Sequence, residues 1–321
     1  MVTLEVIEDC GRLRSFECEW SQFVRKVPPA NPFQRPEWLL TWWSHFGSGS
    51  IRLMVFRQKG EAAGVLPCFL HEWNDRRQMT LMGSGISDYL DPLFESVWVD
   101  GIVERLSAEL RSRDDWDICE WQDLSRDTPL AVLGTIVEDT PCSAIAMEQP
   151  FETFLAVRPT SLRRNLRHDK KKADAIASVQ FEVAESATAE LMDALVRLHG
   201  ARWAKAGEAG MIEANRSEAF LRDVAERFGT KGWLRIFILR FAGCIVAMVL
   251  AFCDEATIYG YLTGLDPQWE EFGFGRELLA QALRYAHEHG YRQWNFLRGE
   301  EPYKFLWGAQ VVPKCRVVIR R

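Results

Sequence analysis

At 321 residues the chain is long enough for about two domains, each with its own hydrophobic core. Its formal net charge of −6 argues against a protein that mainly coats DNA or an anionic membrane. No apolar run approaches the roughly 18 residues of a membrane-spanning helix, and the first residues lack a signal-peptide pattern. We therefore expect a cytoplasmic protein without a membrane span, whose partners are small molecules and not DNA.

The first half has the pattern of a helix, a β-hairpin and a second helix, with the hairpin turn at Gly60. An Asp-Pro pair, Asp91 and Pro92, lies between the hairpin and the second helix. The predicted elements are 36–45, 52–57, 62–66 and 101–111. Gly83 and Gly85 precede the irregular segment before Asp91, and no glycine pair opens the second helix.

The second half repeats this order, with its hairpin turn at Gly243 and its Asp-Pro pair at Asp266 and Pro267. The corresponding elements are 217–228, 235–240, 245–249 and 276–289. Recurrence of one order of elements indicates a duplicated unit. We therefore predict two lobes, residues 1–149 and residues 150–321, of which the first is the degenerate copy.

A cationic helix is predicted at 160–172, where Thr160 or Ser161 can cap its first turn. Its basic residues are Arg163, Arg164, Arg167, Lys170, Lys171 and Lys172. Each one alone is typical of a solvated helix face. Because few acids compensate the group, the patch as a whole favours binding of phosphate or carboxylate groups.

Two glycines, Gly273 and Gly275, open the predicted helix at 276–289. Glycines at a helix start let backbone N–H groups turn toward an anion, and the helix dipole favours the same charge. This arrangement suits the pyrophosphate of coenzyme A, although a tight turn without a ligand gives the same pattern. The first half lacks such a loop, so we place the cofactor in the second lobe.

Four motifs in the second half carry a family resemblance. They are Leu198-His199-x-x-Arg-Trp203, Tyr261-x-x-Gly-x-Asp-Pro267, the Gly273-Phe-Gly275 loop and Asn295-Phe-Leu-Arg-Gly-Glu-x-x-Tyr-Lys304. Together they resemble the Gcn5-related N-acetyltransferase (GNAT) superfamily. More narrowly, the chain is similar to the bacterial branch of cellulose-biosynthesis-associated acetyltransferases, whose relatives include the two-lobed Fem-type aminoacyltransferases.

The resemblance implies an α/β (α+β) fold of two tandem GNAT-like lobes, each a mixed, splayed sheet flanked by helices. It also implies that acetyl-CoA or another acyl-CoA binds as cosubstrate at the splay of one lobe. The cofactor contacts that it implies are Thr263, Phe272, Gly273, Phe274, Gly275 and Arg276. The loop departs from the family pattern Arg/Gln-x-x-Gly-x-Gly/Ala at its first position, where Glu270 stands. A carboxylate there repels a pyrophosphate, so either the backbone and Arg276 hold it or the donor is not coenzyme A.

Direct transfer from a thioester to an amine needs a base for the amine, a polarised carbonyl and an acid for the leaving thiolate. Glu300 is our first candidate for the base and Asp266 the second. Tyr303 is the candidate acid, with packing under the last strand as its alternative role. A backbone N–H around Thr263 would polarise the carbonyl.

Further side chains are candidates for substrate binding. His199, Arg202 and Trp203 share one helix face by their i, i+3 and i+4 spacing. A histidine near a core face is more often a hydrogen-bonded structural residue. The remaining candidates are Arg163 and Arg167 of the cationic helix and Lys304, which could equally be a surface cation. The eight cysteines and the acids show no metal spacing, so we expect no metal site.

The sequence therefore favours an acyl-CoA-dependent N-acyltransferase, with acetyl as the expected acyl group. The acceptor would be an amine of a small molecule or of a cell-envelope or polysaccharide precursor. Two alternatives stay open: a Fem-like transferase that uses aminoacyl-tRNA, in which the cationic helix contacts RNA phosphates, and a non-catalytic module of polysaccharide biosynthesis. The acceptor, the acyl chain length and the oligomeric state do not follow from the sequence.

Overall fold

The computed structural model describes residues 1–27, 30–206 and 215–321, without the side chains of residues 203–206 and 215. The chain forms two compact units. One consists of Met1–Pro141 together with Pro313–Arg321, and the other is Cys142–Val312. No helix in the described part of the chain is long and apolar enough to cross a membrane.

The first unit is built on a sheet with the strand order β1, β2, β3, β4, β6 and β13. These strands are β1 (Thr3–Ile7), β2 (Ser50–Gln58), β3 (Glu61–Trp73), β4 (Arg76–Leu81), β6 (Ile118–Ser125) and β13 (Gln310–Arg320), and the short β5 (Leu93–Phe94) pairs with β3. The helical segments are α1 (Cys10–Ser15), α2 (Glu17–Lys26), η1 (Pro32–Gln34), α3 (Pro36–Phe46), η2 (Ser96–Trp98), α4 (Val99–Ser112) and η3 (Pro129–Leu133). Neighbouring strands are antiparallel except β4 and β6, which are parallel.

The second unit has the strand order β7, β12, β11, β10, β9 and β8. Its strands are β7 (Thr135–Ala146), β8 (Val179–Ala184), β9 (Leu234–Phe241), β10 (Cys244–Cys253), β11 (Thr257–Leu265) and β12 (Gln293–Arg298). Its helical segments are α5 (Phe151–Ala156), α6 (Thr160–Asp174), α7 (Ala189–Ala206), α8 (Asn215–Thr230), η4 (Pro267–Phe272), α9 (Phe274–Glu288) and α10 (Pro302–Leu306). Only the residues of β7 from Cys142 onward belong to this unit.

The two units share one pairing scheme. In both, an antiparallel meander of four strands ends in a parallel pair, β4 with β6 and β11 with β12. A last antiparallel strand then completes each sheet, β13 on β6 and β7 on β12. The predicted α/β fold of two lobes with mixed sheets is confirmed.

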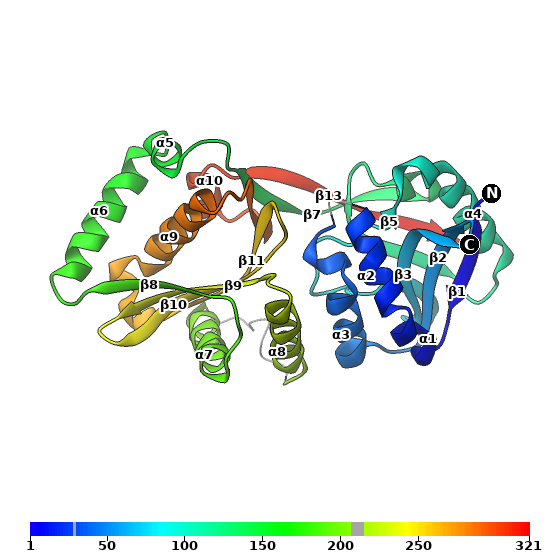
Figure 1. Cartoon of the computed structure of the whole chain (residues 1–321), viewed down its shortest axis with the longest axis horizontal. Coiled ribbons are helices and arrows are strands. Elements are labelled where there is room, and N and C mark those ends of the chain that lie inside the picture. The colour runs from blue at the N-terminus through cyan, green and yellow to red at the C-terminus, as the bar shows by residue number, and fades with distance from the viewer. Residues whose placement is uncertain (28–29, 207–214) are drawn as a thin grey trace. The chain divides into compact units, whose positions relative to one another are not determined.

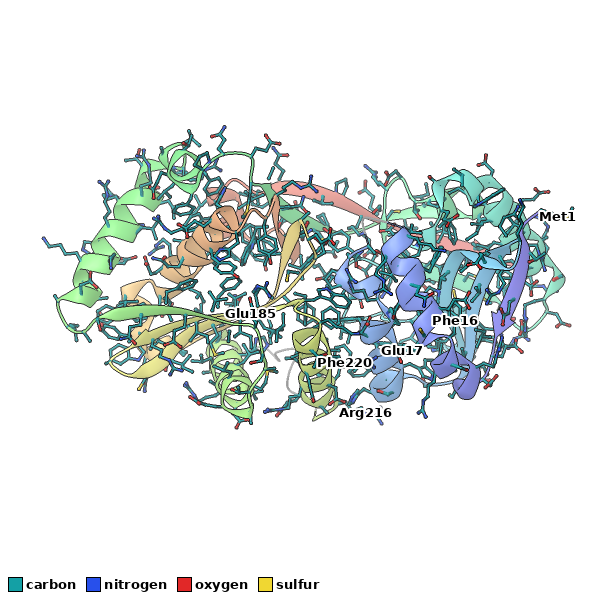
Figure 2. All side chains as sticks on the ribbon, viewed as in Figure 1. Met1, Phe16, Glu17, Glu185, Arg216 and Phe220 are labelled. Carbon is teal, nitrogen blue, oxygen red and sulfur yellow. The ribbon has the colours of Figure 1, made fainter. Side chains whose placement is uncertain are left out.

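Helices cover both faces of the sheet in the second unit. Figure 1 shows α6 and α9 on one face of β8, β9 and β10, and α7 and α8 on the other. The amphipathic α9 buries Leu278, Ala282, Leu283 and Ala286, which recur at helical spacing and pack into the core of this unit. On the other face, Phe220 projects from α8 and is 2% exposed (Figure 2). The core therefore lies on both faces of these strands.

The sheet of the second unit opens between its two parallel strands. β11 and β12 pair only from Thr257 with Gln293 to Tyr259 with Asn295. Beyond this point β11 stays with β10 and β12 stays with β7, and each of these pairs contains a register shift. Such irregularities bend strands and redirect their side chains. They leave a gap, which we call the splay, beside residues 260–265 and 296–298.

The corresponding gap of the first unit is filled by its own chain. The Leu90 amide donates to the Asp123 carbonyl at 2.9 Å, and the Asp91 carboxylate accepts from the amide and the hydroxyl of Ser125 at 2.8 Å each. The neighbouring cavity measures about 10 Å³, near the lower limit for a single water. No pair of glycines opens α4, whose N-cap is Trp98 and whose first turn contains the single glycine Gly101. In the described part of the first copy, these features distinguish this point from the splay of the second.

Candidate functional site

The predicted phosphate loop begins α9 in the expected way. Gly273 is the N-cap, and its left-handed φ of 62° favours glycine. A Cβ on Gly273 would lie 2.3 Å from the Asp169 carboxylate, so this position also requires the absence of a side chain. A Cβ on Gly275 would lie 3.1 Å from a Leu265 methyl group. The two glycines therefore let the start of α9 pack closely against α6 and β11.

A cavity of about 520 Å³ lies beside this loop, and we call it the loop cavity. It is lined by Arg202, Val246, Leu265, Asp266, Pro267, Trp269, Glu270, Gly273, Phe274, Gly275 and Arg276. The Arg276 guanidinium is oriented from α6 by the Asp169 carboxylate, at 2.7 Å. An anion in the loop cavity would meet Arg202, Arg276 and the positive end of α9. Glu270 lines the same cavity, as its place in the sequence led us to expect.

A second cavity, of about 230 Å³, lies at the splay, and we call it the splay cavity. Its lining residues are Leu162, Arg202, Val249, Gly260, Thr263, Leu265, Gly275, Arg276, Leu279, Trp294, Phe296, Tyr303, Leu306 and Trp307. Arg202, Leu265, Gly275 and Arg276 line both cavities, so the two adjoin. A ligand with an anionic end and an apolar arm fits this pair, with the anion at the loop and the arm at the splay.

The cofactor contacts implied by the family resemblance fall into two groups. Gly273, Phe274, Gly275 and Arg276 line the loop cavity, and Thr263 lines the splay cavity. Phe272 lines neither of these two cavities. Its ring stacks on Phe274 at 5.6 Å, and both rings contact Phe241 of β9, at 5.5 and 5.0 Å. Phe272 therefore anchors the loop to the sheet.

Tyr303 lies on α10 at the wall of the splay cavity. Its ring meets that of Phe296 edge to face, with centroids 6.1 Å apart. Burial raises the pKa of Tyr303 to about 12, the negative charge of Glu301 adds to the shift, and Arg202 opposes it. Because Tyr303 is 43% exposed, solvent weakens this shift, but its direction keeps the phenol protonated at neutral pH. Tyr303 can thus donate a proton into the splay cavity.

His199 connects α7 to β11. Its Nδ1 lies 3.2 Å from the Thr263 carbonyl, and the side chain is buried. A Cβ on Gly264 would lie 2.7 Å from Leu198, which shows how closely the helix approaches the strand. Burial lowers the pKa of His199 and the positive charge of Arg202 lowers it further, against the opposing hydrogen bond to Thr263. A neutral imidazole that donates from Nδ1 fits this contact, and His199 lines neither cavity.

This lowered pKa leads to a prediction about stability. The unfolded histidine, with an ordinary pKa of about 6.5, binds a proton more readily than the folded one. The stability that neutral His199 contributes is therefore fully present above about pH 6.5 and is lost as the pH falls toward the lowered pKa. We expect His199→Gln to show a shallower loss of unfolding free energy between about pH 7 and pH 5 in urea denaturation. His168→Gln, on the exposed part of α6, is the control, and equal slopes for His199→Gln and wild type would contradict the assignment.

The two candidate bases occupy different places. Asp266 is the N-cap of η4, where its carboxylate accepts from the Gln268 amide at 3.0 Å and lies 3.6 Å from Arg197. It lines the loop cavity but not the splay cavity. Glu300 follows β12 and is exposed, and it lines neither of these two cavities. Neither candidate base therefore shares a cavity wall with Tyr303 in these two cavities.

The predicted substrate contacts are spread over several elements. Arg202 lines both cavities, whereas the Trp203 side chain lies outside the described residues. Arg163 donates to the Arg158 carbonyl at 3.2 Å and Arg167 to the Arg163 carbonyl at 3.3 Å, so both lie along α6 outside the two cavities. The Lys304 ammonium is buried and bonded to backbone carbonyls, not presented to a substrate.

Sequence reasoning missed the aromatic wall of the splay cavity. Trp294 and Phe296 alternate along β12 and line the cavity together, with Trp307 beyond α10. Their alternation was a usable signal, but apolar residues in a strand are usually read as core. Asp169, which orients Arg276, gave no signal, because its partner lies 107 positions away. In the described ranges, no group of three or more His, Cys, Asp or Glu side chains is arranged to hold a metal ion.

Comparison with known proteins gives one match to a protein family. Residues 160–305 match the family model of the acetyltransferase (GNAT) domain. The matched segment contains α6, the splay, the loop and Tyr303. Among curated protein sequences, none matches the chain.

Solved structures extend the similarity of fold beyond the GNAT domain. The chain resembles FemX, with a TM-score of 0.68 and 11% identity over 93% of this chain and 95% of that one. It resembles the C-terminal domain of a putative lysylphosphatidylglycerol synthetase from Agrobacterium fabrum, with a TM-score of 0.61 and 12% identity over 95% and 92%. A tandem GNAT protein from the clavulanic acid biosynthesis pathway gives a TM-score of 0.50 and 12% identity over 99% and 98%. At identities this low, the similarity shows a shared fold alone.

Proposed function

We propose that the chain is an acyl-CoA-dependent N-acyltransferase that moves an acetyl group directly to an amine. The observation that carries this proposal is the adjoining pair of cavities, one beside the glycine loop at the start of α9 and one at the splay with Tyr303 in its wall. A pyrophosphate at the loop would place the thioester arm toward the splay. The acceptor that we propose, an amine of a polysaccharide or cell-envelope precursor, rests on the resemblance of the sequence motifs to cellulose-biosynthesis-associated acetyltransferases.

Binding of the donor divides between backbone and side chains. The backbone at Gly273 and Gly275 and the start of α9 would hold the pyrophosphate, with Arg276 and Arg202 supplying positive charge. The aromatic and aliphatic wall of the splay cavity would hold the pantetheine arm. Backbone amides of the splayed part of β11, around Thr263, are the candidates to polarise the carbonyl.

In the proposed transfer step, the amine reaches the thioester carbon at the splay. Glu300 takes the proton of the amine, directly or through a water, as the C–N bond forms. The C–S bond then breaks, and Tyr303 gives its phenolic proton to the leaving thiolate. The tyrosinate recovers a proton from solvent, which its raised pKa favours. Glu300 returns its proton to solvent, so both side chains end in their starting charge states and the products are the amide and the free thiol.

Glu300→Gln tests the assignment of the base. Because Glu300 is exposed, we expect its loss to be moderate, with turnover about 10-fold to 100-fold slower and donor binding unchanged. Raising the pH should restore part of the rate, since a larger share of the amine is then already deprotonated. The matched control is Glu288→Gln at the C-terminal end of α9, which is also exposed. Equal turnover in Glu300→Gln and wild type at all pH values would remove Glu300 from the mechanism.

The experiment that tests the activity is release of free coenzyme A thiol from acetyl-CoA with a panel of amino sugars, amino acids and polyamines. Amine-dependent release that is lost in Tyr303→Phe supports the proposal. Binding of coenzyme A without turnover on any amine would favour a non-catalytic module of polysaccharide biosynthesis, because the donor site would then exist without the reaction.

A second candidate is a transferase that uses aminoacyl-tRNA. Glu270 and Asp266 bring two carboxylates into the loop cavity, which disfavours a pyrophosphate, and α6 exposes Arg164, Arg167 and Lys171. An RNA backbone could follow such a cationic helix. Binding of charged tRNA that weakens steeply with added salt, together with no binding of coenzyme A, would favour this candidate.

A further inference from the structure

The chain makes an unusual turn directly after β12. Leu297 has a left-handed φ of 62°, which a branched side chain adopts only at a cost of about 1–3 kcal/mol. The buried Asn295 supports it, because its side-chain oxygen accepts the Leu297 amide at 2.8 Å. The next glycine, Gly299, has a φ of 105°. Surrounding contacts must therefore hold this turn in place.

Lys304 supplies such contacts from α10. Its ammonium donates to the carbonyl of Arg298 at 2.7 Å and to that of Gly299 at 3.1 Å, with the Leu297 carbonyl at 3.5 Å. The carboxylate of Glu301 lies 2.9 Å away. Lys304 is 2% exposed, and an ammonium buried this deeply is stable only when its protons have acceptors. We call Lys304 with the carbonyls of residues 297–299 the carbonyl latch.

The carbonyl latch joins α10 and β12, two elements that both line the splay cavity. α10 has five residues, and a helix this short is not stable on its own. Tyr303 precedes Lys304 on α10, and Phe296 precedes Leu297 on β12, so the latch lies beside the contact between the Tyr303 and Phe296 rings. Loss of the latch would let α10 move relative to β12, and Tyr303 would move with it.

We propose that Lys304 is a positioning residue that fixes α10 against the end of β12 and so sets the position of the Tyr303 hydroxyl in the splay cavity. The structural part of this proposal is that Lys304 fixes α10 against the end of β12. The catalytic part rests on the proposed acyl transfer, in which Tyr303 protonates the leaving thiolate. A displacement of about 1 Å at a catalytic group can slow a reaction about 100-fold, so a latch outside the chemistry can still control the rate.

The test compares Lys304→Met with wild type, because methionine keeps the unbranched shape of the side chain but cannot donate to the carbonyls. Amide hydrogen exchange should accelerate at least about 10-fold in residues 298–307 and stay unchanged elsewhere in the second unit. In the same variant, kcat for acetyl transfer should fall at least about 10-fold, while Kd for desulfo-coenzyme A stays within about twofold. Lys26→Met, which removes an exposed ion pair with Glu61 in the first unit, is the control.

A double variant shows whether Lys304 acts through Tyr303. If it does, Tyr303→Phe with Lys304→Met should have the same kcat as Tyr303→Phe alone, within about twofold, because the two effects are not independent. Multiplication of the two effects would overturn the positioning role. If Lys304→Met fails to fold, Asn295→Ala removes another support of the same turn and should give the same local exchange and the same selective loss of kcat.

The outcomes separate the latch from the proposed function. Unchanged exchange in residues 298–307 of folded Lys304→Met overturns the latch, whatever the activity. If wild type neither binds coenzyme A nor transfers an acetyl group, the proposed function fails, and the exchange measurement still decides whether the latch exists. Faster local exchange with unchanged kcat would show that the latch is structural and would overturn its catalytic part.

Discussion

Gly275→Asp is expected to weaken binding of acetyl-CoA at least about 100-fold while the fold stays intact. The new carboxylate would lie at the start of α9, where backbone N–H groups would donate hydrogen bonds to the proposed pyrophosphate. Two like charges about 4 Å apart repel by roughly 4 kcal/mol near a protein surface, which corresponds to a loss of about 1000-fold before solvent screening reduces it. An acidic residue in the first turn of a helix interacts favourably with the helix dipole, so the stability of the helix itself should not fall.

Equilibrium dialysis with labelled acetyl-CoA measures this effect, and thermal unfolding checks the fold. Gly275→Asn is the matched control, because it adds nearly the same bulk without the charge. A Cβ here already lies 3.1 Å from Leu265, so Gly275→Asn should weaken binding modestly. Equal affinities for wild type and Gly275→Asp would show that the loop does not bind the donor. Equal losses in the aspartate and asparagine variants would show that bulk, not charge, is decisive.

Tyr303→Phe is expected to lower kcat about 100-fold or more, with Kd for the donor nearly unchanged, since removal of a general acid typically costs 100-fold to 10,000-fold. Phenylalanine keeps the edge-to-face contact with Phe296, so the wall of the splay cavity is preserved. Because burial raises the pKa of Tyr303 to about 12, the wild-type rate should persist through about pH 10, where an ordinary tyrosine is half ionised. A loss of rate in wild type centred near pH 10 would contradict this.

The leaving group provides a sharper test of Tyr303. A thioester of a thiol with a low pKa needs no acid, so the difference between Tyr303→Phe and wild type should largely disappear with such a donor. Single-turnover measurements with both donors separate this effect from product release. An equal loss with both donors would show that Tyr303 acts by packing against Phe296 and not as an acid.

The fold was predictable because its signals are local and occur twice. Apolar segments around Gly60 and Gly243 are typical hairpins, and both lie where the sequence places them. The strand that completes each sheet was not predictable. Residues Pro313–Arg321 complete the first unit, and Cys142–Ala146 complete the second, because each strand pairs with an edge far away in the sequence. The local sequence pattern of either strand does not indicate which strand it pairs with. The division at residue 150 stays a prediction.

For the candidate site, the backbone requirements were easier to predict than the roles of charged residues. Gly273 was identifiable because a helix start with a left-handed residue needs glycine, and the structure shows that conformation. The hydrogen-bond partners of His199 and Lys304 depend on the tertiary structure, because both side chains are buried and contact backbone carbonyls outside their own helices. Glu300 follows a strand end as expected, yet its exposure could not be read from neighbouring residues.

Calorimetric titration of the wild-type protein with desulfo-coenzyme A, which cannot react, tests the central claim most directly. The proposed donor site predicts one binding site per chain with a dissociation constant in the micromolar range, and the same titration of Gly275→Asp should give no measurable heat. Absence of binding to the wild-type protein would contradict an acyl-CoA donor and would favour aminoacyl-tRNA as the donor.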